Sequence, residues 1–286
     1  MKRIVTLLIL LSTYIFSNIN VVVSILPEQT FVKAIGGDRV HTALMVLPGN
    51  SPHTYEPKPS QMKEIAKADL YFAIGVEFEK VWLPKFASLN PHMQIVDVAK
   101  GIERLPMQTH HHEAHAKEHH ESEHGGLDPH VWTSPANVKV IAGNICDALS
   151  EKDPANSAYY RQNLEAFLKK ADTTDREIKK ILSHTPKGTK FMVFHPSWGY
   201  FAHAYGLVQL PVEVEGKSPK PRELIDLIKE ARREHIKAIF TQPEFSDATA
   251  KIMAKELGIK VIKVSPMSAH WSRTLLNIAH AIAGNE

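Results

Sequence analysis

Histidine is the residue type that stands out in this chain of 286 residues, which carries 17 histidines. Seven of them fall in one short stretch, residues 110–124, which reads HHHEAHAKEHHESEH. Imidazole nitrogens interleaved with carboxylates form a loose, multidentate trap for divalent transition-metal ions. A stretch this polar cannot pack against a core, so we expect a solvated loop that binds metal weakly, or else a spacer of merely histidine-biased composition. The seven candidate ligands of this auxiliary loop are His110, His111, His112, His115, His119, His120 and His124.

Three further histidines stand alone in similar surroundings. His53 lies in NSPHTYEP, His130 in LDPHVW and His195 in FHPSWGYF, and each is directly beside a proline. His53 and His195 follow predicted strands, and in open α/β sheets ligands bind outside the carboxyl ends of the strands. Proline fixes the backbone next to the imidazole and thereby lowers the ordering cost of binding a ligand. A lone loop histidine is usually only a hydrogen-bonding residue, but three in one chain with a histidine-rich loop favour a shared metal site.

These histidines must be positioned by a fold that alternates short apolar runs with helical stretches. Such alternation is typical of parallel βαβ units, so we predict an α/β protein with two (β/α)4-type lobes and parallel sheets. The predicted strands of the two halves are Val21–Leu26, Thr42–Val46, Leu70–Ile74, Ile95–Val98, Phe191–Phe194, Val212–Val214, Ala238–Phe240 and Val261–Val264.

A charged segment between the two halves, residues 155–183, carries apolar residues at helical spacing. A continuous helix of that length spans roughly 43 Å at 1.5 Å per residue, which suits a stiff connection between lobes. Two shorter helices broken near Thr173–Thr174 are the alternative. The predicted organisation is a signal peptide at 1–17, an N-terminal lobe at 18–150 with a His-rich loop at 106–126, a linking helix at 151–184 and a C-terminal lobe at 185–286.

The start of the chain and its composition narrow the class of protein. Two basic residues followed by an apolar run predict an N-terminal signal peptide and hence a periplasmic or other extracytoplasmic location, with a retained N-terminal anchor as the alternative. With 43% hydrophobic and 23% charged residues the chain can bury a core, and 34 basic against 31 acidic residues argue against a nucleic-acid partner. A single cysteine, Cys146, excludes an intramolecular disulfide and a cysteine-rich zinc site.

Taken together, the PHTYEP, DPHVW and FHPSWGYF segments, the signal peptide, the histidine-rich insert and the long helix resemble the zinc and manganese solute-binding proteins of ABC-type metal importers. The resemblance covers about residues 20–284. It implies that His53, His130 and His195 are metal ligands, with the first two in the N-terminal lobe and the third in the C-terminal lobe. It also implies that the ion lies in the cleft between lobes joined by one long rigid helix.

One departure from the family concerns a fourth ligand. Where the family often has an aspartate after the last strand, this chain has Ser265, which is a poor ligand. Water, or one of Glu244, Asp247 and His270, remains open as the fourth ligand. Three neutral imidazoles without a clear carboxylate favour Zn²⁺ over Mn²⁺, which prefers harder oxygen ligands. Tyr55 and Glu56 are candidates for fixing the His53 ring, with a purely structural turn as the alternative.

The expected function is therefore capture of a divalent transition metal, zinc first, outside the cytoplasmic membrane and its delivery to the permease of an ABC importer. We expect a monomer that is not an enzyme. Two alternatives remain: a secreted zinc-dependent hydrolase, because three histidines with an open position also hold catalytic zinc, and an extracellular metal buffer or adhesin without a transporter. The chain contains no HExxH motif, which argues against the hydrolase.

Overall fold

The computed structural model describes residues 18–108, 126–213 and 217–284. It contains two parallel four-stranded sheets of the same topology, which confirms the predicted α/β class. The first sheet has the order β2-β1-β3-β4 and the second β6-β5-β7-β8, so the first strand of each lobe lies in the interior of its sheet. The predicted signal peptide and most of the predicted histidine-rich loop lie outside the described residues.

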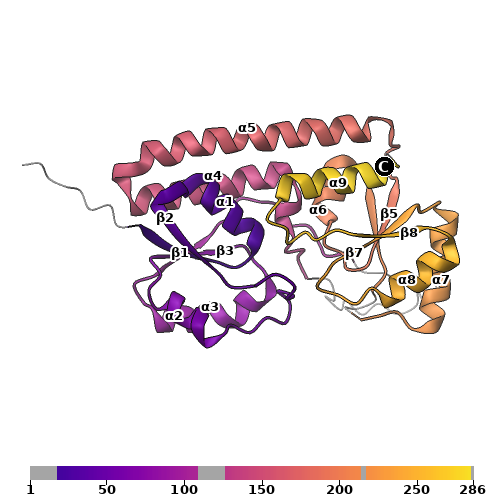
Figure 1. Ribbon diagram of the computed structural model, residues 1–286, viewed down its shortest axis with the longest axis horizontal. Coiled ribbons are helices and arrows are strands. Elements are labelled where there is room, and N and C mark those ends of the chain that lie inside the picture. The colour runs from indigo at the N-terminus through magenta and orange to yellow at the C-terminus, as the bar shows by residue number, and fades with distance from the viewer. Residues whose placement is uncertain (1–17, 109–125, 214–216, 285–286) are drawn as a thin grey trace, which may run out of the picture.

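In the first lobe, short strands alternate with helices that cover both faces of the sheet, and the two central strands, β1 and β3, are the buried ones (Figure 1). Strand β3 is buried at all four positions, as expected for a parallel strand covered on both sides. The elements are β1 (Ile19–Val23), α1 (Leu26–Gly36), β2 (Val40–Leu44), α2 (Pro59–Ile65), β3 (Leu70–Ala73), α3 (Glu77–Leu89) and β4 (Gln94–Asp97).

Two helices connect the lobes. Helix α4 (Pro135–Lys152) is followed by α5 (Ser157–Ile181), which runs along both lobes (Figure 1). The predicted continuous helix is confirmed, and the break at Thr173–Thr174 does not occur. Both threonine hydroxyls donate to the carbonyl four residues earlier at 2.9 Å, which accommodates these residues within the helix.

The second lobe repeats the pattern of the first. Its elements are β5 (Lys190–Val193), α6 (Gly199–Tyr205), β6 (Val208–Pro211), α7 (Pro221–Arg233), β7 (Ala238–Thr241), α8 (Ala248–Leu257), β8 (Lys260–Lys263) and α9 (Trp271–Ala283). The strand predicted at Val212–Val214 lies earlier in the structure, because β6 ends at Pro211 and residues 212–213 are not part of it, while Val214 lies outside the described residues. Strand β6 lies at the edge of its sheet, where the missing N–H of a proline costs no sheet hydrogen bond.

The lobes share one hydrophobic core through α4, α5 and α9. Trp271 of α9 packs edge-on against Phe31 of the first lobe at 5.8 Å between ring centroids. The indoles of two tryptophans cross the boundary in opposite directions: Trp132 donates to the carbonyl of Pro266 at 2.9 Å, and Trp271 donates to that of Trp132 at 2.7 Å. The two lobes are therefore joined by packing and buried hydrogen bonds, as well as by the chain itself.

None of the described helices has the length and apolar character needed to cross a membrane.

Candidate metal site

His53 lies in the long loop after β2, where the neighbouring carbonyl of Pro52 accepts a hydrogen bond from the N–H of Phe78 at 3.3 Å. Its Nδ1 lies 3.0 Å from Oε2 of Glu77, the first residue of α3. Burial opposes the ionisation of Glu77, but the hydrogen bond and charge interaction with His53 prevail and lower the pKa of this carboxyl to about 2. Burial lowers the pKa of His53 and the same pairing with Glu77 raises it, with a net rise. The first ring is thus held by a carboxylate.

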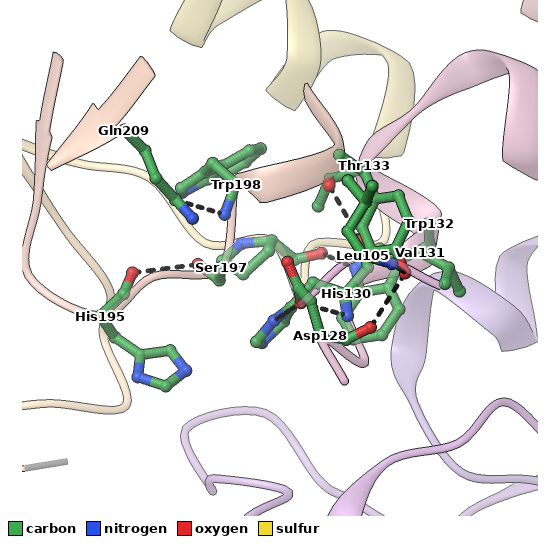
Figure 2. A network of polar contacts seen from close by, with 12 residues as sticks. Leu105, Asp128, His130, Val131, Trp132, Thr133, His195, Ser197, Trp198 and Gln209 are labelled. Atoms are coloured by element: carbon green, nitrogen blue, oxygen red, sulfur yellow. Dashed lines mark hydrogen bonds and ion pairs between the residues drawn. The ribbon is translucent and has the colours of Figure 1, made fainter. Parts of the chain in front are cut away.

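His130 follows the short connection after the histidine-rich loop and is only 3% exposed. Oδ1 of Asp128 lies 2.7 Å from its Nδ1 and also accepts its backbone N–H at 2.9 Å. The carbonyl of His130 accepts the hydroxyl of Thr133 at 2.9 Å, which closes a tight turn before α4 (Figure 2). Asp128, two residues before His130, therefore fixes both the backbone and the ring of this histidine.

His195 stands two residues after the end of β5 and is 6% exposed. Its Nδ1 lies 2.8 Å from Oε1 of Glu213, which follows the neighbouring strand β6. Phe245 stacks on its ring at 4.8 Å between centroids. Burial lowers the pKa of His195, which favours the neutral imidazole that a metal ion requires.

All three rings therefore share one pattern, in which Nδ1 faces a carboxylate and Nε2 is left to face the cleft. An ionised carboxylate only accepts, so Nδ1 must carry the proton and the lone pair of a neutral ring sits on Nε2. The ligand atoms of His53, His130 and His195 lie within 4.8 Å of one another, and Nε2 of His53 and His195 approach to 2.9 Å. Lone pairs brought this close repel unless a proton or a cation lies between them.

The dimensions suit a small divalent ion. Tetrahedral zinc with Zn–N bonds of about 2.0–2.1 Å needs its nitrogens roughly 3.3–3.4 Å apart, which falls within the spread of the three rings. The histidines line a cavity of about 20 Å³ in the cleft, which is the space of a single water molecule or ion.

The other predicted candidates lie as follows. Glu244 lines the same cavity, and its Oε1 accepts the hydroxyl of Ser265 at 2.9 Å. Asp247 lies in ion pairs with Lys251 at 2.9 Å and Lys263 at 3.1 Å, and His270 is exposed at the start of α9. Neither Asp247 nor His270 is among the residues that line the cavity. The seven histidines of residues 110–124 lie outside the described residues.

The carboxylates at Nδ1 are the part of the site that the sequence prediction missed. Tyr55 instead donates to Gln61, and Glu56 is exposed, so the partner of His53 is Glu77 and not its own neighbours. Glu77 and Glu213 are distant from their histidines in sequence and meet them only because all follow the carboxyl ends of parallel strands. Only Asp128 carried a local signal, the two-residue spacing in DPH.

The chain is similar to known metal-binding components of ABC importers. A model of the family described as zinc-uptake complex component A, periplasmic, matches residues 21–279. The high-affinity zinc uptake system protein ZnuA of Bacillus subtilis is 29% identical over 246 residues, 85% of this chain and 76% of that protein. The manganese ABC transporter substrate-binding lipoprotein ScaA of Streptococcus gordonii is 28% identical over 257 residues, 86% of this chain and 78% of that protein. A crystal structure of ZnuA is similar with a TM-score of 0.85 and 39% identity, covering 94% of this chain and all of that one.

Two parallel α/β lobes of one topology with a histidine-lined cleft define a bilobal solute-binding protein of the metal-binding kind. The chain belongs to the zinc-uptake complex component A family, whose model covers nearly all of its described residues.

Proposed function

We propose that this protein captures Zn²⁺ outside the cytoplasmic membrane and delivers it to the permease of an ABC importer. The ligands in this proposal are the Nε2 atoms of His53, His130 and His195. The observation that carries it is their convergence, with every Nδ1 held by its own carboxylate. Carboxylate–histidine pairs of this kind orient the ring and raise its basicity toward a metal.

Three points support zinc over manganese within this proposal. The three converging rings are nitrogen donors, which borderline ions accept more readily than Mn²⁺ does. The relative from B. subtilis is named for zinc uptake, and the family model is named for it too. Among the described residues that line the cavity, Glu244 alone carries a carboxylate, whereas Mn²⁺ prefers several hard oxygen ligands.

Competition titration against a chromogenic zinc chelator tests the proposal. The metal-free protein is expected to bind one zinc tightly, and His195→Ala to lose at least 100-fold in affinity because one of three protein ligands is gone. His203→Ala, which removes an exposed histidine of α6, is the matched control and should retain the tight zinc. Tight Mn²⁺ binding with weak Zn²⁺ binding in the same assay would contradict the choice of ion.

The proposal includes that the protein acts as a monomer and is not an enzyme. The relatives named above are transport components, in keeping with a binding role. Zinc-loaded protein is expected to show no turnover of generic ester or peptide substrates. Hydrolysis that disappears in His195→Ala would instead support the hydrolase.

A further inference from the structure

Gln242 is a buried polar residue beside the three histidines, and the site described above gives it no role. It follows β7 directly, is 2% exposed and lines the cavity between the imidazoles. Its Nε2 donates to the backbone carbonyl of His195 at 3.0 Å and to Oγ of Ser197 at 2.7 Å. A backbone carbonyl can only accept, so these contacts fix which end of the amide carries the nitrogen.

The other end of this amide, Oε1, is buried and has no hydrogen-bond partner among the described residues. Leaving a buried acceptor unpaired costs about 1–3 kcal/mol, so such an atom in a native structure requires an explanation. The donor end is anchored by two contacts, so the acceptor cannot turn away to find a partner elsewhere without breaking them.

A ligand of the captured ion is the candidate for the missing donor. Three imidazoles leave one position of a tetrahedral zinc open to a further ligand. A water molecule at that position is polarised by the ion and becomes a strong hydrogen-bond donor. An amide oxygen accepts such a bond without adding charge, so the bound water need not lose its proton.

We propose that Oε1 of Gln242 accepts a hydrogen bond from the water molecule that completes the coordination of the captured ion. Gln242 is then a positioning residue, which acts on the ion through that water. This inference rests on the proposed function, because it concerns the fourth position of the same site. It replaces the aspartate ligand expected from the family by a water held by an amide.

Zinc affinity of two variants separates this role from a merely structural one. Gln242→Met removes both ends of the amide and is expected to bind zinc about 10–100-fold more weakly, the usual effect of losing an outer-shell partner. Gln242→Glu keeps an acceptor but cannot donate to the His195 carbonyl, and is expected to match or exceed wild-type affinity. If the amide only anchors the His195 backbone, Gln242→Glu will be at least as weak as Gln242→Met, and the proposal is overturned.

Gln29→Met is the matched control, since the amide of Gln29 donates to Thr42 in the first lobe, away from the cavity. It should bind zinc like the wild type. The melting temperatures of the metal-free variants show whether each one folds. If Gln242→Met does not fold, Gln242→Glu and Gln242→Asn still test the proposal. The side chain of asparagine is one methylene shorter, so its oxygen lies further from the ion and its water. Gln242→Asn is therefore expected to bind zinc more weakly than the wild type.

Co²⁺ provides a spectroscopic readout of the fourth ligand. The visible ligand-field bands of the cobalt-loaded wild-type protein should shift in Gln242→Met and stay unchanged in Gln29→Met. Unchanged bands in Gln242→Met would refute the inference while leaving the proposed function intact. Failure of the wild-type protein to bind one zinc would refute the proposed function itself.

Discussion

At the scale of single residues, each histidine of the site is paired with one carboxylate, and the pairing decides which nitrogen faces the cleft. Glu213 makes this pairing for His195 entirely from within the second lobe, with both side chains less than one-tenth exposed. The carboxylate does not itself touch the position between the rings, so its contribution can be separated from that of the ligands.

We predict that Glu213→Ala binds zinc about 10–100-fold more weakly, because the ring of His195 loses the acceptor that fixes its tautomer. Competition titration measures the loss. Glu256→Ala, which removes an exposed carboxylate paired with Arg232, should bind zinc like the wild type. Equal affinities for all three proteins would show that the Nδ1 contact has no role in binding.

A second residue-scale feature is a pair of buried acids behind the site in the first lobe. Glu28 accepts the backbone N–H groups of Ser24 and Ile25 through one oxygen, while its other oxygen has no partner among the described residues. Burial, together with the charge of Glu79, raises the pKa of Glu28 well above its ordinary value. Burial likewise raises the pKa of Glu79 to about 7.

These shifts predict a stability that falls as the pH rises. A raised carboxyl pKa means that the folded state binds the proton more tightly than the unfolded one, so the contribution is complete below pH about 4.5 and is lost as the pH rises through about 7. Glu28→Gln retains the oxygen that accepts from Ser24 and Ile25 but removes the charge. The fall in melting temperature between pH 5 and pH 8 should therefore be smaller in this variant than in the wild type.

Thermal melts of the metal-free proteins across that range test this prediction. Glu56→Gln, at an exposed position, is the control and should behave like the wild type. If the melting temperature of Glu28→Gln falls with pH as steeply as that of the wild type, ionisation of Glu28 does not destabilise the folded protein.

At the scale of elements, the start of α6 fits directly against the support of His130. A Cβ on Gly199 would lie 2.5 Å from Oδ2 of Asp128, whose other oxygen holds the His130 ring. Figure 2 shows Asp128 and His130 facing the segment that carries Ser197 and Trp198. The hydroxyl of Tyr200, one residue further along α6, donates to the carbonyl of Asp128 at 3.1 Å. The second lobe thus helps to position a histidine of the first.

Gly199→Ala is expected to destabilise the protein by about 1–3 kcal/mol, the usual cost of overpacking, and to weaken zinc binding because Asp128 must move. Chemical denaturation and competition titration measure the two effects. Gly143→Ala, in α4 where a Cβ meets nothing within 4 Å, is the matched control. It should be neutral or stabilising by up to about 1 kcal/mol and should bind zinc normally. Unchanged zinc binding in Gly199→Ala would contradict the proposed link between α6 and His130.

Periodicity and motif spacing in the sequence were sufficient to predict the elements, but not all of their limits. Alternating apolar runs predicted both sheets, and the helical spacing between 155 and 183 predicted α5. The residues of β6 were misplaced because Gln209 interrupts the apolar run while Val212 continues it. The partners of His53 and His195 could not be predicted, because contacts between strand ends depend on strand order, which a single sequence does not specify. Gln242 was missed because its donor contacts are to the backbone of His195 and to Ser197.

At the scale of the whole molecule, residues of both lobes line the site, and the described residues on either side of the histidine-rich segment pair with each other. The described ends of that segment are tied together, since the N–H of Met107 donates to the carbonyl of Gly126 at 2.8 Å and the N–H of Asp128 donates to the carbonyl of Leu105 at 2.8 Å. A segment whose ends already lie side by side can be shortened without moving the residues on either side of it.

Replacing residues 109–125 by a short glycine-serine turn is therefore expected to spare the tight zinc and to remove any weaker additional equivalents. Calorimetric titration distinguishes the two classes of binding. Loss of the tight equivalent in this deletion would show that the segment supplies ligands to the high-affinity site, against the division of roles proposed above.

The central claim is that one ion lies between the two lobes on the three imidazoles. Anomalous diffraction at the zinc absorption edge, from crystals of the protein loaded with one equivalent of zinc, tests it most directly. A single strong peak is expected about 2.0–2.1 Å from the Nε2 atoms of His53, His130 and His195. A peak bound through Nδ1 atoms, or one located away from these three residues, would contradict it.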